Sequence, residues 1–270
     1  MSLPPVTVAL TTIRARLPQL PLVVGSLLRQ TRAPDQILLS ISAEPFMLDE
    51  GVRFADLPAA LRDLAAAGRL DVLAVPNTGP YRKLLPALRQ HAGSPRLVAT
   101  ADDDMLYAPT WLAGLLERFE AGPAVCAYRC RAMATLGGRF ARYARWPLLP
   151  AGPDAHGDAP PHLHPLLTIA TGVRGVLYDA AFFPDLDLLD ALRALAPGQD
   201  DLAFKAASLC GGIPTALVHR PGADAGRPKG VLPGDTLFES NKRANDGAWN
   251  RIVGYLEAIG RFRLSDLLGT

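Results

Sequence analysis

The stretch Arg96-Leu-Val-Ala-Thr-Ala-Asp-Asp-Asp104 places three consecutive carboxylates directly after a run of small and apolar residues. Such a run predicts a buried strand. Three adjacent like charges at its end repel one another and require a compensating cation, most simply a divalent metal. Mg²⁺ and Mn²⁺ leave coordination positions to substrate phosphates, so the stretch indicates a metal site for a phosphate-bearing ligand.

The same stretch also suits the start of a helix. Aspartate is a favoured helix N-cap, and Pro109 fits the first turn of a helix that begins there. A solvated turn before a helix is therefore the alternative, and the triplet alone does not decide between the two.

The segments around the triplet alternate between strand-like and helical patterns. Strands are expected at 6–11, 36–42, 70–75 and 96–101, with amphipathic helices between them. This alternation predicts an α/β fold with a mostly parallel, Rossmann-like central sheet that helices cover on both faces.

Polar residues follow each of these expected strands. They are Thr11 and Thr12, Ser42, Asn77 and the aspartate triplet. Because ligands of such sheets bind beyond the carboxyl ends of the strands, we expect the four loops to meet at one crevice. This convergence favours the metal hypothesis over the solvated turn.

The second half of the chain has a less regular pattern. Strands are expected at 124–129 and 168–178, with a hairpin over 132–143 that turns at Gly137 and Gly138. A long loop, 147–165, separates them; its His156, His162 and His164 could bind a metal, but a flexible polar loop is the favoured interpretation. A basic Gly/Pro-rich segment, 220–234, could close over a phosphate.

Composition limits the classes of protein to consider. Of 270 residues, 49% are hydrophobic, and 28 basic and 26 acidic residues give a net charge of +2 without a basic run, so we expect no nucleic-acid partner. Three cysteines without a CxxC pair argue against disulfides and a cysteine zinc site. Since no signal peptide or 18-residue apolar run is present, we expect a cytoplasmic protein, with peripheral membrane association left open.

A second acidic site lies at Asp200 and Asp201, on the first turn of a helix expected within 198–212. A helix N-terminus stabilises an acid, but capping explains one carboxylate more readily than two. A carboxylate whose ionisation is tuned by charged neighbours suits a general base.

Together these segments resemble the GT-A glycosyltransferases, particularly the family 2-like inverting enzymes of bacterial surface-polysaccharide assembly. The opening 6–14 is similar to the first strand of that family, 101–112 to its DxD segment, 171–178 to a Gly-rich acceptor-side segment, and 199–204 to its acidic catalytic pair. The resemblance covers about residues 5–220 and depends on the order and spacing of the motifs.

The resemblance implies a single domain over 1–270, with a nucleotide-sugar-binding half (1–123) and an acceptor-binding and catalytic half (124–270). It implies a hexosyltransferase-type enzyme of polysaccharide biosynthesis. Such an enzyme would move a sugar from a nucleotide-sugar donor, with a UDP-sugar favoured, to a glycan or lipid-linked acceptor, and would invert the anomeric carbon. Retention remains an alternative outcome.

The resemblance also implies roles for individual residues. Mn²⁺ or Mg²⁺ would bind Asp104 with Asp102 nearby, His219 would be a further ligand, and Asp201, or else Asp200, would be the catalytic base. The nucleotide sugar would bind Thr11, Thr12, Arg14, Ser42, Lys83, Asp102 and Asp103.

Several of these assignments have structural alternatives. Relatives carry an acidic pair after the second strand, whereas this chain has Ser40-Ile-Ser-Ala-Glu44, so Ser42 or Glu44 would substitute. Lys83 could be solvated rather than bound to phosphate or carboxylates, and His219 could be structural. Trp146 is a candidate for stacking on a sugar. A basic cluster could contact either an anionic lipid-linked acceptor or only solvent; its members are Arg139, Arg142 and Arg145.

Two other functions compete. A sugar nucleotidyltransferase shares the sheet and the metal, but its Gly-rich loop after the first strand has no counterpart in Thr11-Thr-Ile-Arg-Ala-Arg16. A catalytically silent nucleotide-binding or scaffold protein of the same fold would bind nucleotide without consuming a donor, and Asp201→Asn would leave it unchanged.

Overall fold

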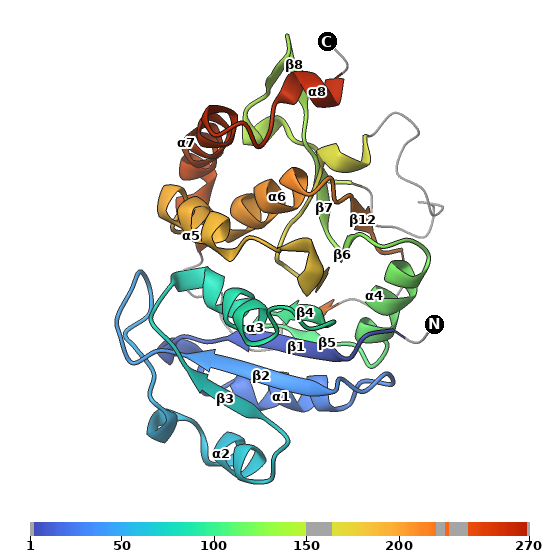
Figure 1. Ribbon diagram of the computed structural model, residues 1–270. Helices are drawn as coiled ribbons and strands as arrows, with labels where there is room; N and C mark the ends of the chain where they lie inside the picture. Colours follow the sequence, from blue (N-terminus) through green and yellow to red (C-terminus); the bar gives the residue numbers. More distant parts are fainter. Residues whose placement is uncertain (1–2, 150–163, 220–224, 227–236, 269–270) are drawn as a thin grey trace.

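The computed structural model describes residues 3–149, 164–219, 225–226 and 237–268 (Figure 1). Most of the loop 147–165 and of the segment 220–234 lies outside the described residues, and so do the roles expected for them. Within the described part, no helix is long and apolar enough to cross a membrane.

A seven-stranded sheet forms the centre of the molecule. Its order is β12 (Thr215–Leu217), β6 (Val125–Ala127), β11 (Val176–Asp179), β4 (Leu97–Ala101), β1 (Val6–Thr11), β2 (Gln36–Ile41) and β3 (Asp71–Ala74). Every neighbouring pair is parallel except those of β11, which runs antiparallel to β4 and β6. The predicted mostly parallel sheet is confirmed, and it includes strands from both halves of the chain.

Helices cover both faces because strand side chains alternate between two hydrophobic cores. Val8 and Leu10 of β1 face the core shared with α1 (Leu20–Leu28), α2 (Ala59–Ala66) and α4 (Trp111–Glu120). Ala9 faces the other core, which contains residues of α3 (Leu85–Gln90), α5 (Leu186–Leu195), α6 (Asp200–Cys210), α7 (Leu237–Ala258) and α8 (Leu264–Leu268). Figure 1 shows α5, α6 and α7 grouped above β1, β2 and β3.

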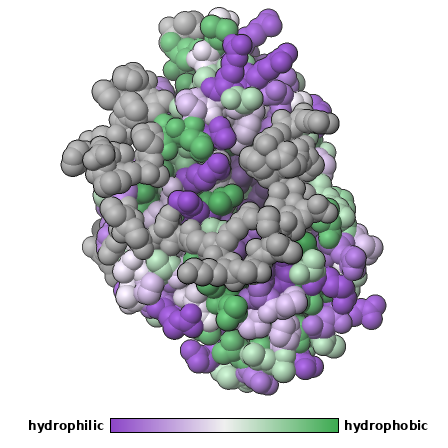
Figure 2. Space-filling model, turned by 180° about the vertical axis from the view of Figure 1, so that it is seen from behind, coloured by the Kyte–Doolittle hydropathy of each residue, from purple (hydrophilic) through white to green (hydrophobic). Residues whose placement is uncertain are grey.

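Smaller elements surround the sheet. They are β5 (Leu106–Tyr107) paired with β13 (Ala225–Gly226), β7 (Cys130–Ala132) paired with β10 (Thr168–Ala170), and the 3₁₀ helices η1 (Arg14–Arg16), η2 (Phe54–Asp56), η3 (Gly79–Lys83), η4 (Tyr143–Arg145), η5 (Pro165–Leu167) and η6 (Ala180–Phe182). The predicted hairpin is confirmed as β8 (Thr135–Leu136) and β9 (Arg139–Phe140), with positive φ at both turn glycines. On the face opposite to Figure 1, hydrophilic and hydrophobic residues are interspersed (Figure 2).

Two expectations for the second half are wrong. The single strand expected at 168–178 is divided into β10 and β11 by a turn in which Arg174 has φ 75° and Gly175 has φ 95°. Trp146, expected to stack on a sugar, is 1% exposed. Its ring packs 5.7 Å from that of Trp249, because α7 covers it.

Candidate active site

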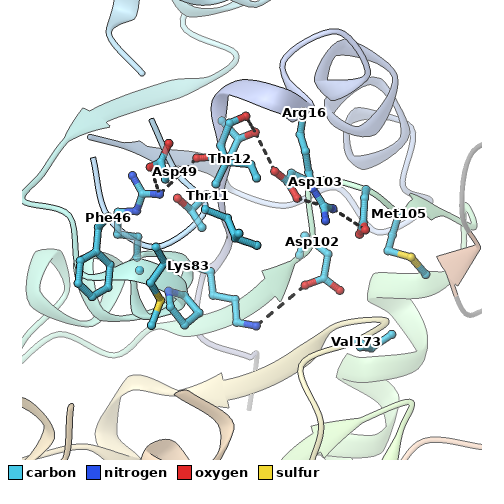
Figure 3. A pocket seen from close by; sticks show the side chains of 18 of the residues that line it. Thr11, Thr12, Arg16, Phe46, Asp49, Lys83, Asp102, Asp103, Met105 and Val173 are labelled. Atoms are coloured by element: carbon cyan, nitrogen blue, oxygen red, sulfur yellow. Dashed lines mark hydrogen bonds and ion pairs between the residues drawn. The ribbon is translucent and has the colours of Figure 1, made fainter. Parts of the chain in front are cut away.

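A cavity of about 480 Å³ opens at the carboxyl ends of β1, β2 and β4 (Figure 3). The loops after these strands and η3 contribute Thr11 and Thr12, the segment 46–49, Lys83 and Asp102–Asp104 to its walls. The second half contributes Arg129, Val173 and Arg174. The predicted convergence of strand-end loops is therefore present.

Two carboxylates of the triplet face Arg16. The guanidinium Nη1 lies 3.2 Å from Asp103 Oδ1 and also forms an ion pair with Asp104. Thr12 Oγ1 donates a hydrogen bond of 2.8 Å to Asp103 Oδ2. Burial opposes the charge on Arg16, but Asp103 and Asp104 outweigh it and raise the pKa of the guanidinium. Arg16 is the compensating cation in this part of the triplet.

Asp102 has a weaker counter-charge than its two neighbours. Its backbone N–H donates to Tyr107 Oη at 2.6 Å, and one carboxylate oxygen lies 4.0 Å from Lys83 Nζ. Figure 3 shows this carboxylate directed toward Lys83 across the cavity. Burial raises the pKa of Asp102 to about 7, Lys83 opposes the shift, and Asp104 and Asp103 add to it.

The donor set fits a metal ion only in combination with a ligand. Among the described residues, no three His, Cys, Asp or Glu side chains are grouped to hold a metal by themselves. However, Mg²⁺ needs only one or two carboxylates when phosphate oxygens and water complete its shell, and Asp102 and Asp104 both line the cavity. These residues fit an ion that binds together with a diphosphate.

His219 is not grouped with these carboxylates. It follows β12, which is three strands away from β4 in the sheet, roughly 14 Å at the usual strand spacing. Burial lowers its pKa, and Arg118 on α4 lowers it further. Its role as a metal ligand stays a prediction that this arrangement does not support.

Lys83 links the two acidic sites. Its Nζ lies 3.2 Å from Asp200 Oδ2 as well as 4.0 Å from Asp102 Oδ1, and its side chain is 14% exposed, so it is not a solvated residue. Burial opposes its charge, but Asp200, Asp201 and Asp102 outweigh burial and raise the pKa of Lys83 above its usual value. Lys83 therefore stays protonated between the two clusters.

Asp201 lies at the first turn of α6, and its Oδ2 accepts a hydrogen bond of 2.9 Å from the backbone N–H of Gly172. Burial raises its pKa to about 6, the neighbouring Asp200 adds to the shift, and Lys83 opposes it. A Cβ on Gly172 would lie 3.0 Å from Asp201 Oδ1 and in contact with Lys83 Nζ. Glycine at this position thus leaves room for both side chains.

Three other predicted donor-site residues have partners within the protein. Thr11 lines the cavity, but its Oγ1 donates to the Ser40 carbonyl at 2.8 Å. Arg14 is directed at Asp56, 2.8 Å away, and is not part of the cavity wall. Ser42 is buried and accepts a hydrogen bond from the Glu44 N–H at 3.2 Å.

In the loop after β2, the acidic residue that lines the cavity is Asp49, which the sequence analysis did not identify. Its carboxylate forms a buried ion pair of 2.6 Å with Arg82 and accepts a hydrogen bond of 3.0 Å from Asn77 Nδ2. Both charged residues line the cavity beside the apolar side chains Phe46, Met47 and Leu48. No local pattern joins Asp49 to Arg82, because the contact depends on the tertiary fold.

No protein-family model matches the sequence, and no curated protein is significantly similar to it. Among solved structures, residues 1–349 of S. aureus TarS with UDP superpose with a TM-score of 0.51 and 15% identity, over 82% of this chain and 59% of that one. The TarS complex with UDP-GlcNAc gives 0.51 and 12%, over 93% and 71%. A 4-diphosphocytidyl-2C-methyl-D-erythritol synthase gives 0.48 and 14%, over 93% and 99%. Together with the sheet order and the strand-end cavity, the likeness to TarS establishes that this chain has the GT-A fold.

Proposed function

We propose that the protein is an inverting glycosyltransferase that moves a hexosyl group from a nucleotide sugar, a UDP-sugar in the favoured case, to a hydroxyl of a glycan or lipid-linked acceptor. One observation carries the proposal: Lys83 lies between Asp102 of the aspartate triplet and the Asp200–Asp201 pair, in which Asp201 has a pKa of about 6. A proton acceptor and a phosphate-binding site would then be neighbours in one active site. The fold it shares with TarS, which binds UDP and UDP-GlcNAc, supports the donor class.

The first half, 1–123, would bind the donor. The side chains of Phe46, Met47 and Leu48 offer an apolar wall for a nucleobase, and the Asp49–Arg82 ion pair fixes the loop that carries them. Thr12 and Lys83 lie further along the cavity, where the protonated amine of Lys83 suits a diphosphate.

A divalent ion, Mn²⁺ or Mg²⁺, would be held by Asp102 and Asp104. When bound, the ion would neutralise the diphosphate and stabilise the charge of the departing nucleotide. The triplet supports this role because its three carboxylates share one paired guanidinium and a lysine that is closer to Asp200. The remaining negative charge favours a cation.

The second half, 124–270, would bind the acceptor and supply the base. Asp201 would take the proton of the acceptor hydroxyl, whose oxygen attacks the anomeric carbon while the bond to the diphosphate breaks and the nucleotide leaves with the electron pair. Attack from the face opposite the leaving group inverts the configuration. The Gly172 N–H fixes the orientation of Asp201. The neighbouring carboxylate, Asp200, is neutralised by its ion pair with Lys83.

A lipid-linked acceptor would bring this protein to the cytoplasmic face of a membrane. Arg139, Arg142 and Arg145 are exposed and could contact anionic headgroups there. Peripheral association is part of the proposal and is tested by flotation of the protein with anionic vesicles.

A thermal-shift screen tests the proposed function. The purified protein is heated with UDP, GDP, CMP and dTDP sugars, each with Mn²⁺ and with EDTA, because a bound ligand raises the melting temperature by mass action. We expect a UDP-sugar to stabilise the protein in Mn²⁺ and much less in EDTA, and to be consumed when acceptor is added. Stabilisation without any donor consumption would indicate a silent binding protein, and no stabilisation by any nucleotide would contradict the proposal.

A further inference from the structure

Arg129 lines the cavity on the wall formed by the second half, in the short link between β6 and β7. Its guanidinium Nη1 donates a hydrogen bond of 2.8 Å to Thr171 Oγ1, and the Thr171 N–H donates to the Arg129 carbonyl at 2.9 Å. Main chain and side chain are thus both tied to Thr171. The position of the positive charge at the cavity wall is therefore fixed.

The charge of Arg129 differs from those of three other cations that line the cavity. Arg16, Arg82 and Lys83 each form an ion pair with an aspartate. Within the described part of the chain, no carboxylate lies within ion-pair distance of Arg129, and its hydrogen-bond partner is a neutral hydroxyl. A half-buried charge without a counter-ion is costly, so an anionic ligand would complete this site.

Neighbouring arginines add positive potential around Arg129. Burial lowers the pKa of Arg129, and repulsion from Arg131 and Arg174 lowers it further, while Tyr143 and Asp201 offset part of the shift. The positive potential at this wall is therefore only partly compensated by the protein. This positive potential would therefore attract an anion that enters the cavity from this side.

One short turn connects Arg129 to the proposed base. Thr171 binds the guanidinium, and the next residue, Gly172, donates its N–H to Asp201. Lys83, which pairs with Asp200 and approaches Asp102 of the triplet, lies against the same turn, next to the place where the donor diphosphate is proposed. We infer that the acceptor carries a phosphate or carboxylate group that Arg129 binds while an acceptor hydroxyl faces Asp201, an inference that rests on the proposed function.

The test is a ligand-observed NMR titration of the full-length protein saturated with UDP and Mn²⁺, and of the free protein. The probes are glycerol 3-phosphate, galacturonate and neutral galactose, so that phosphate and carboxylate are distinguished. The variants are Arg129→Gln, Arg129→Lys, which keeps the charge, and Arg69→Gln, which removes an exposed arginine outside the cavity. Calorimetry measures UDP binding by each variant in parallel.

We expect one of the two anionic probes to bind the wild type more tightly than galactose does. Arg129→Gln should weaken that probe about tenfold or more, as for loss of a charged hydrogen bond. Arg129→Lys should weaken it less, and Arg69→Gln should leave it unchanged, with UDP affinity constant throughout.

Three outcomes would overturn the inference. They are equal binding of anionic and neutral probes, an anionic probe that binds Arg129→Gln as tightly as wild type, and a loss of UDP affinity in Arg129→Gln as large as the loss of probe affinity. The last would assign Arg129 to the donor phosphates. Failure of the wild type to bind UDP contradicts the proposed function instead, and the titration of the free protein then decides whether Arg129 is an anion site.

Discussion

The two aspartate clusters of this protein are neutralised in different ways. Asp103 and Asp104 at the end of β4 contact the guanidinium of Arg16, whereas Asp200 on α6 forms an ion pair with Lys83. Each cluster leaves one further carboxylate with a weaker partner. These are Asp102 and Asp201, and burial raises their pKa values to about 7 and about 6.

The two remaining carboxylates also differ in position. Asp102 lines the cavity, while Asp201 lies beside Lys83 under Gly172 and takes its hydrogen bond from a backbone N–H. The comparison therefore separates a carboxylate that can meet a metal and phosphates from one that can meet a hydroxyl proton. Charge balance, rather than the number of acids, identifies the residue in each cluster that is available for chemistry.

The largest expected effect is on the base. Asp201→Asn should lower the rate of sugar transfer by about 10²- to 10⁴-fold, because the amide cannot accept the hydroxyl proton. Transfer is measured as donor consumption with acceptor present. Asp187→Asn, an exposed acid in the first turn of α5, is the matched control and should keep full activity. Full transfer by Asp201→Asn would remove Asp201 from the mechanism.

The next effect tests the residue that joins the clusters. Lys83→Met should lower the free energy of unfolding by about 3 kcal/mol, because it leaves Asp200 buried without its counter-charge. Urea denaturation measures this loss. Lys83→Met combined with Asp200→Asn should recover part of it, since the uncompensated charge is then absent. A Lys83→Met protein as stable as the wild type would mean that the clusters are not coupled through Lys83.

Two glycines of the same turn should respond differently to alanine. Gly175 has φ 95°, and a Cβ there would lie 2.5 Å from the buried Trp111 ring, so Gly175→Ala should cost about 1–3 kcal/mol of stability. At Gly172 the closest atom is the flexible end of Lys83, so Gly172→Ala should cost less stability but displace the amine and reduce transfer. The melting temperature and the transfer rate of both variants test this difference. An equal loss of stability in Gly172→Ala and Gly175→Ala would contradict the prediction.

The pH dependence gives the smallest effect. Because the pKa of Asp201 is raised to about 6, transfer should fall as pH decreases through 6, by about tenfold per pH unit below it. For stability the sign is opposite. The folded pKa values of Asp201 and Asp102 exceed the unfolded value, so protonation of these two groups between pH 7 and pH 5 favours the folded state. Activity should therefore be lost at pH 5 without unfolding by circular dichroism, and a flat rate profile down to pH 5 would exclude the assigned base.

The first half of the fold could be predicted because its strands are short, mostly apolar runs that alternate with helical patterns. The predicted strand 6–11 has the same bounds as β1, and the expected strand-end loops do meet. In the second half, the turn around Gly172 and Gly175 divides the stretch 168–178, and the division depends on contacts with Lys83 and Trp111 that lie far away in the sequence.

The site could be predicted only where strand order determines it. The triplet lies at the end of β4 and the acidic pair on the first turn of α6, as the strand and helix patterns predicted, while the roles of these residues stay predictions. Arg14 was expected at the cavity, but Arg16 occupies it, because the two side chains leave η1 in different directions. The Asp49–Arg82 pair and Arg129 were not predicted, since their partners come from separate loops.

The most direct test of the account is calorimetric titration of UDP with Mn²⁺ into Asp102→Asn and Asp201→Asn. The account predicts that Asp102→Asn weakens UDP binding at least about tenfold, as for a lost charged contact, while Asp201→Asn binds UDP as the wild type does but does not transfer sugar. Equal UDP affinity in both variants, or equal loss in both, would contradict the division of labour between the two aspartate clusters.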